Sequence, residues 1–164
     1  RIGVIIRDKV LYAETQLTGQ PALAVSEYAG FPAENIKVLT SPEIQRLVVS
    51  YALAAKRAWR AGFDGIEIHA GHGYLLSQFL SPAYNQRQDQ YGGSVANRAR
   101  IHLQIYQAIR DVVGSEYPLL IKMNCADFIE KGLTIDDSLQ AAKLFADAGF
   151  DDLHRWPPCA GNRK

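Results

Sequence analysis

The sequence predicts an α/β fold, an incomplete (β/α)8 TIM barrel that comprises about half of the barrel in three to four βα units. Amphipathic helical segments are each followed by a short apolar strand, which is typical of a parallel sheet. The junction between helix and strand also repeats, because AAK at 54–56 and AGFD at 61–64 recur at the same spacing at 141–143 and 148–151. A closed barrel typically needs about 250 residues. This chain of 164 residues is therefore expected to form only part of one.

The first unit contains a helix that is expected from Thr40 to Gly62. Thr40 and Glu43 have the spacing of a capping box, and Pro42 suits the first turn. The apolar stripe of this helix comprises Ile44, Leu47, Val48, Tyr51 and Ala55. The segment from Gly65 to His69 follows directly, and its β-branched residues predict a buried strand that ends at His69.

Two further helices repeat this arrangement. One is expected to begin at Ser94 or Asn97 and to end at Gly114, and the strand from Leu119 to Met123 follows it. The other helix is expected from Thr134 to Ala148. Its predicted apolar face comprises Leu139, Ala142 and Phe145.

The regular pattern is expected to be lost from residue 152 to residue 164. One more strand should follow the last helix, but this segment reads DLHRWPPCAGNRK. His154, Arg155 and two prolines stand where apolar alternation is expected. A polar tail explains this composition, and so does a truncated or altered C-terminus, which we favour.

Composition and charge argue against several classes of partner. The 18 basic and 17 acidic residues are mixed along the chain, so no basic stripe for nucleic acid is evident. No apolar run approaches the roughly 20 residues that span a bilayer, and charges interrupt residues 1–10 where a signal peptide would be apolar. Cys125 and Cys159 lack the spacing of a metal site or a disulfide scaffold. We therefore expect one cytoplasmic domain that binds neither nucleic acid nor a membrane, and self-association through the open sheet edges.

Residues suited to catalysis gather after the first predicted strand. His69 ends that strand, and His72 and Tyr74 follow among glycines that permit a sharp turn. Strand ends of this kind carry the active sites of barrels. Two imidazoles and a phenol can polarise one carbonyl or nitro oxygen, and Tyr74 can also give a proton. This set predicts the reduction of an electron-poor double bond in a small molecule.

Each of these residues also has a plainer interpretation. A histidine at a strand end more often makes a structural hydrogen bond, and Tyr74 alone is compatible with a core position. The spacing of His69 and His72 also suits zinc, but a zinc site requires at least a third ligand. Glu67 is expected to face away from His69. Hydrolysis assisted by a metal is therefore the weakest hypothesis.

A long motif extends from His69 to Arg98. Its matching positions are His69, His72, Gly73, Tyr74, Phe79 to Pro82, Asn85, Arg87, Asp89, Tyr91 to Ser94, Asn97 and Arg98. With this motif the chain resembles the Old Yellow Enzyme family of NADH:flavin oxidoreductases and FMN-dependent ene-reductases. So many positions over about 30 residues make a chance match negligible.

The resemblance implies FMN as the cofactor and NADH or NADPH as the hydride donor. It implies that His69 and His72 bind the activating oxygen of the substrate, that His69 also touches the flavin, and that Tyr74 is the proton donor. Lys122 occupies the place of the basic residue that family members hold near N1 and O2 of the flavin. Alternatively, Lys122 forms an ion pair with Asp127 or Glu67.

The implied reaction is hydride transfer from NAD(P)H through the flavin to an activated alkene, which is conjugated to a carbonyl group or bears a nitro group. Residues 1–164 are then the central part of an FMN-binding NADH:flavin oxidoreductase barrel. The phosphate-binding strands of such barrels are not recognisable here, so weak FMN binding by this chain alone is expected. The alternative is a catalytically inactive, truncated remnant of that family. The polar loop at 85–94 is expected to be structural.

Overall fold

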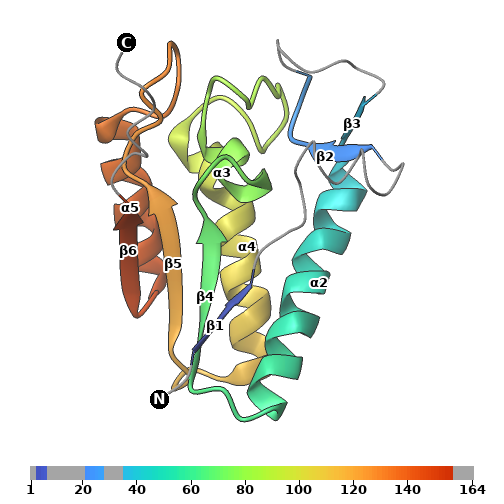
Figure 1. Ribbon diagram of the computed structural model, residues 1–164, viewed down its shortest axis with the longest axis vertical. Coiled ribbons are helices and arrows are strands. Elements are labelled where there is room, and N and C mark those ends of the chain that lie inside the picture. The colour runs from blue at the N-terminus through green and yellow to red at the C-terminus, as the bar shows by residue number, and fades with distance from the viewer. Residues whose placement is uncertain (1–2, 7–20, 28–34, 157–164) are drawn as a thin grey trace.

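The computed structural model of the protein describes residues 3–6, 21–27 and 35–156. Within these residues, parallel strands form one sheet in the order β1-β4-β5-β6 (Figure 1). The strand bounds are Gly3–Ile6 for β1, Gly65–Ala70 for β4, Leu119–Asn124 for β5 and Asp152–Trp156 for β6. A second, two-stranded sheet pairs β2 (Ala22–Ala24) with β3 (Ile36–Val38), just before the first long helix. The α/β class with parallel strands is therefore as the sequence predicts.

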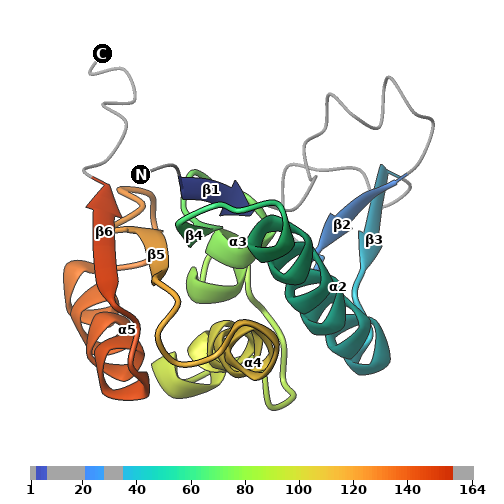
Figure 2. The same cartoon turned by 90° about the horizontal axis from the view of Figure 1, so that it is seen from below.

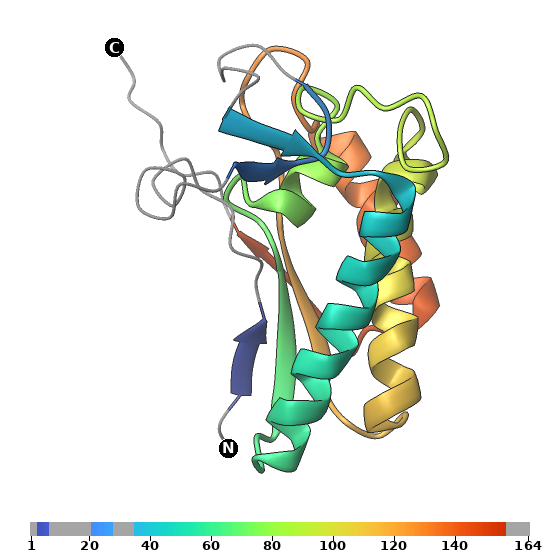
Figure 3. The same cartoon turned by 90° about the vertical axis from the view of Figure 1, so that its right-hand side faces the viewer.

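The described helices all cover the same face of the four-stranded sheet. The helices are α2 (Ser41–Arg60), α3 (Leu75–Leu80), α4 (Val95–Val113) and α5 (Ile135–Ala148). Figures 2 and 3 show the strands on one side of the molecule and these helices on the other. No described helix covers the opposite face, which corresponds to the inside of a closed barrel. None of the described helices combines the length and the apolar character that crossing a membrane requires.

The helix α2 forms as its sequence predicts. The carboxylate of Glu43 accepts a hydrogen bond from the N–H of Thr40 at 2.9 Å, and Pro42 lies in the first turn. The buried stripe comprises Ile44, Val48, Tyr51 and Ala55, while Leu47 is half-buried. For α4 the structure selects Ser94 as the cap, since its Oγ accepts a hydrogen bond from the N–H of Asn97 at 3.3 Å. Both helix starts therefore follow from local capping.

The helix α5 has the predicted bounds but presents a different face. It follows Thr134, whose Oγ caps its first turn, and it ends at Gly149 in the left-handed conformation. The predicted apolar face is wrong in part, because Leu139 is 49% exposed and Ala142 is only half-buried. The side chains that are buried against the sheet are Ser138, Ala141 and Phe145. Both sets have helical spacing, so only the position of α5 on the sheet distinguishes them.

The strand β6 forms at residues 152–156, although the apolar alternation of the sequence is lost from residue 152. Its residues 152–156 pair in parallel with β5, with Asp152 opposite Leu120 and Trp156 opposite Asn124. Backbone pairing requires no particular side chain, so the polar residues of this segment do not prevent it. Just before the strand, the Asp151 carboxylate accepts a hydrogen bond from the Leu119 N–H at 2.8 Å. Residues 157–164, with the two prolines, lie outside the described residues.

A histidine lies in the core between α3, α4 and α5. The side chain of His102 is completely buried, and its ring packs against Phe145 with centroids 5.4 Å apart. Its Nε2–H donates to the carbonyl oxygen of Leu76 at 3.0 Å. Because burial disfavours the charged imidazolium, it lowers the pKa of His102 from 6.5 to about 4. His102 is therefore a neutral core residue.

This buried histidine predicts that acidification destabilises the protein. Unfolding exposes His102 to water, where it binds a proton near pH 6.5, whereas the folded protein resists protonation down to about 4. The contribution of neutral His102 to the free energy of unfolding is complete above pH 6.5. It is lost as the pH falls toward 4, by up to about 1.4 kcal/mol per pH unit. Urea unfolding followed by circular dichroism above and below pH 6.5 measures this loss. His102→Gln keeps a donor but does not titrate. If the free energy of unfolding of this variant falls with pH as steeply as that of the wild type, His102 is not the cause of the loss.

Candidate active site

A turn after β4 brings the predicted residues together. His72 and Gly73 both have left-handed backbone, with φ values of 60° and 76°. This conformation turns the chain sharply between the strand and α3, which begins directly after Tyr74. The N–H of Tyr74 donates to the carbonyl oxygen of Gly71 at 3.3 Å. Since left-handed backbone is uncommon outside glycine, His72 requires support from its surroundings.

The side chains of His69, His72 and Tyr74 form one cluster of rings. The ring centroid of His69 lies 5.0 Å from that of His72 and 5.2 Å from that of Tyr74. His69 is buried, Tyr74 is half-buried and His72 is exposed. The three side-chain donors therefore share one place at the carboxyl end of β4, as their spacing predicts.

Lys122 lies beside this cluster on β5. It stands opposite His69 in the register of the two strands, so both side chains are on the face that no described helix covers. Partial desolvation by the neighbouring side chains, and then the positive charge of Lys122, lower the pKa of His72 below its ordinary value of 6.5. His72 therefore stays neutral to a lower pH than a free histidine, and a neutral imidazole keeps one N–H that can donate.

Glu67 corrects the prediction that it faces away from His69. The two residues are separated by one position on β4, so strand alternation places their side chains on the same face. A carboxylate oxygen of Glu67 lies 3.2 Å from Nδ1 of His154, which stands opposite Lys122 on β6. Glu67 thus has a histidine partner on this face. Over residues 3–6, 21–27 and 35–156, no group of three or more His, Cys, Asp or Glu side chains could hold a metal ion.

A small cavity adds residues that the sequence analysis does not single out. Its volume is about 240 Å³, and it is lined by His72, Gly73, Tyr84, Asn124, Ala126, Asp127 and Ile129. Asn124 follows Lys122 by two positions on β5, so strand alternation would have placed it at the site. Tyr84 comes from the loop after α3, and nothing in its local sequence indicates this position. Burial, and then the charge of Asp127, raise the pKa of Tyr84 above 10.0.

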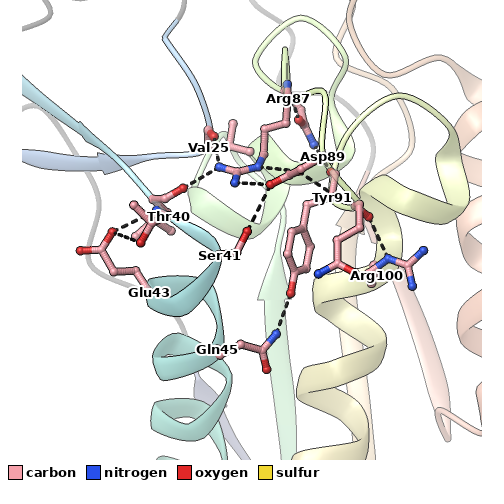
Figure 4. A network of polar contacts seen from close by, with 12 residues as sticks. Val25, Thr40, Ser41, Glu43, Gln45, Arg87, Asp89, Tyr91 and Arg100 are labelled. Carbon is pink, nitrogen blue, oxygen red and sulfur yellow. Dashed lines mark hydrogen bonds and ion pairs between the residues drawn. The ribbon is translucent and has the colours of Figure 1, made fainter.

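The polar loop that follows α3 satisfies backbone groups, as predicted. Nη1 of Arg87 donates to the carbonyl oxygens of Val25 at 2.9 Å and Leu39 at 2.6 Å, while Nη2 pairs with Asp89 at 2.6 Å (Figure 4). This arrangement ties the loop to β2 and to the segment after β3. Gly92 is required here, because a Cβ atom would lie 2.0 Å from the Arg87 carbonyl oxygen. The polar side chains of this loop therefore have a structural role.

Comparisons with known proteins agree with this architecture. The sequence profile of the NADH:flavin oxidoreductase / NADH oxidase family matches residues 11–156. A metal reductase of Desulforamulus reducens is 47% identical over 87% of this chain and 22% of its own length. An NADPH dehydrogenase of Clostridium acetobutylicum is 44% identical over 79% of this chain and 39% of its own length. The chain thus spans well under half of the length of these relatives.

Solved structures give the same result for the fold. The Old Yellow Enzyme homologue from Zymomonas mobilis superimposes with a TM-score of 0.74 at 29% identity, over 87% of this chain and 44% of that one. Morphinone reductase in complex with tetrahydroNAD gives 0.71 at 32% identity, over 84% of this chain and 43% of that one. The sheet and its helices therefore form part of a (β/α)8 barrel. Because the family profile covers most of its length, the chain belongs to the NADH:flavin oxidoreductase / NADH oxidase family.

Proposed function

We propose that this chain forms the central part of an FMN-dependent NAD(P)H oxidoreductase of Old Yellow Enzyme type. FMN and a nicotinamide nucleotide are the cofactors of its family. When bound, FMN would supply the transfer of hydride from NADH or NADPH to an activated alkene, which is conjugated to a carbonyl group or bears a nitro group. The observation that carries this proposal is the cluster of His69, His72 and Tyr74 beside Lys122, on one face of the sheet.

The residues present fit a flavin in charge and in position. Reduced flavin carries negative charge on its ring, and Lys122 provides a half-buried cation on the open face of the sheet. A partly buried site strengthens such an attraction relative to water. His69 stands opposite Lys122 in the register, so we propose that both side chains contact the flavin.

The remaining residues suit the binding and protonation of a substrate. We propose that His69 and His72 donate hydrogen bonds to the carbonyl or nitro oxygen, where negative charge develops as hydride arrives. His72 suits this role because its lowered pKa keeps it a neutral donor. The phenol of Tyr74 lies next to His69, and it gives a proton to the carbon that does not receive hydride.

Partners and location are also proposals. Among the described residues, β1 pairs with β4 alone and β6 with β5 alone, and open edges of this kind recruit further strands. We therefore propose self-association through these edges. Two cysteines without a pairing pattern favour a reducing, cytoplasmic compartment.

Titration of the 164-residue chain with FMN, followed by flavin fluorescence, tests the proposed flavin contact. We expect the wild-type chain to quench the fluorescence, and we expect Lys122→Met to weaken binding about tenfold, because a hydrogen bond to a charged group is lost. The matched control is Lys143→Met, since Lys143 is paired with Asp147 on the exposed side of α5. Equal affinity of wild type and Lys122→Met would contradict the role of Lys122. Absence of binding by every variant would favour the catalytically inactive remnant.

A further inference from the structure

Asn124 connects the turn at His72 to the loop that follows β5. Its Oδ1 accepts a hydrogen bond from the backbone N–H of His72 at 2.9 Å. Its Nδ2 donates to Oδ1 of Asp127 at 3.1 Å and to Oγ of Ser77 at 3.3 Å. Gly71 leaves the necessary room, because a Cβ atom there would lie 3.1 Å from Oδ1 of Asn124. One side chain thus joins the turn at His72 and the helix α3 to the loop that follows β5.

Asp127 determines which way the Asn124 amide points. An ionised carboxylate only accepts hydrogen bonds, so it must face the Nδ2 group, and this leaves Oδ1 toward the His72 N–H. The loop in turn holds Asp127. The Oδ2 atom of Asp127 accepts a hydrogen bond from the Leu133 N–H at 2.9 Å, and the backbone N–H of Asp127 donates to the Leu133 carbonyl oxygen at 3.0 Å. The conformation of the loop at 125–133 therefore affects the backbone of His72, because the Asn124 amide is hydrogen-bonded to both.

His72 depends on this support because of its backbone conformation. Its φ of 60° lies in the left-handed region, which costs energy in a residue with a Cβ atom and persists only where neighbouring groups hold it. The direction of a side chain follows from the backbone that carries it. A shift of the His72 backbone would therefore move its ring away from His69, whose centroid is 5.0 Å distant.

We propose that Asn124 is the positioning residue for His72, and that Asp127 sets its orientation, so that the loop at 125–133 controls where the His72 ring lies. This inference rests on the proposed binding of substrate by His72 and deepens it. Neither Asn124 nor Asp127 needs to touch the substrate. Changes in the sequence of this loop would alter the affinity of His72 for a substrate oxygen.

A pair of variants with exchanged polarity tests the proposal. In Asp127→Asn, the new side chain can accept from Leu133 only by turning its own amide N–H groups toward Nδ2 of Asn124. Two N–H donors then face each other, so the Asn124 amide must rotate, and its Oδ1 no longer accepts the hydrogen bond from the His72 N–H. In the double variant Asn124→Asp with Asp127→Asn, the N–H groups of His72 and Leu133 still donate, and the bond between residues 124 and 127 is restored with donor and acceptor exchanged. The Ser77 hydroxyl rotates to donate.

Nuclear magnetic resonance of the 164-residue chain provides the readouts. In Asp127→Asn we expect the His72 amide to exchange about tenfold faster with solvent. We also expect the pKa of the His72 imidazole to rise toward its ordinary 6.5, because the displaced ring is better solvated and lies farther from Lys122. The double variant should restore both quantities. The imidazole resonance of the buried His102 shows whether each variant is folded.

Two outcomes would overturn the proposal. One is an unchanged His72 amide and imidazole in Asp127→Asn, and the other is a folded double variant that fails to restore them. Neither measurement requires flavin. A chain that binds no FMN would therefore contradict the proposed function and leave the positioning of His72 by Asn124 to be decided separately.

Discussion

Replacing Tyr74 by phenylalanine is expected to slow the reduction of an activated alkene by about 10²- to 10⁴-fold, the usual contribution of a general acid. Reduction of the flavin by NAD(P)H should proceed at an unchanged rate, since that step needs no proton from this phenol. Single-turnover stopped-flow absorbance of the flavin-loaded protein measures the two half-reactions separately. The phenylalanine keeps the ring that packs at 5.2 Å from His69, so the geometry of the cluster is retained.

Tyr117→Phe is the matched control for this experiment. Its hydroxyl donates to the carbonyl oxygen of Phe63, at the opposite end of the sheet from His69. We expect this variant to leave both half-reactions unchanged. If Tyr74→Phe slows both half-reactions equally, the phenol is not the proton donor and acts on the flavin or on the stability of the site.

Replacing Arg98 by methionine is expected to lower the free energy of unfolding by about 3 kcal/mol, the lower end for breaking a buried ion pair. The Arg98 side chain is 6% exposed, and its Nη2 lies 2.9 Å from the carboxylate of Asp137. It also donates from Nε to the Gly93 carbonyl oxygen at 3.0 Å and from Nη1 to that of Leu80. Methionine fills the space of the stem but leaves a carboxylate and two carbonyl groups without this donor.

The midpoint of urea unfolding, followed by circular dichroism, measures this loss. Lys143→Met is the matched control, because it removes an exposed ion pair to Asp147 on the same helix that carries Asp137. Such a pair contributes about 0.5 kcal/mol at most. Arg98→Lys keeps the charge but not the fork of donors, so an intermediate loss is expected. Equal losses in Arg98→Met and Lys143→Met would show that the buried network does not stabilise the fold.

Arg98 also illustrates the difference between matching a motif and understanding it. The sequence places it among the matching positions of the family but assigns it no task. The structure shows that it holds Leu80 and Gly93, the two sides of the loop between α3 and α4. Its position in the motif therefore reflects the scaffold of the site, and its burial could not be read from a single charged residue.

Features that depend on neighbours in the chain are predictable from the sequence alone. The caps at Thr40 and Ser94, and the end of α5 at Gly149, follow from local hydrogen bonding and backbone freedom. The glycines beside His72 indicate the sharp turn that gathers His72 and Tyr74, whereas the left-handed backbone of His72 itself depends on its surroundings. Strand alternation also determines which residues of β4 and β5 share a face, and it places Glu67 on the same face as His69, contrary to the prediction.

Other features depend on contacts between segments that are far apart in sequence. The position of α5 on the sheet decides which of its faces is buried, since the predicted face and the buried face both have helical spacing. The strand β6 forms despite its polar side chains, because the backbone of β5 offers hydrogen bonds to any sequence. The carboxyl ends of parallel strands meet at one edge, and this brings Asn124 to the backbone of His72, 52 positions away. Local sequence determines which side chains are available, whereas the packing of strands determines which of them meet, since hydrogen bonds between distant segments exist only after the sheet has formed.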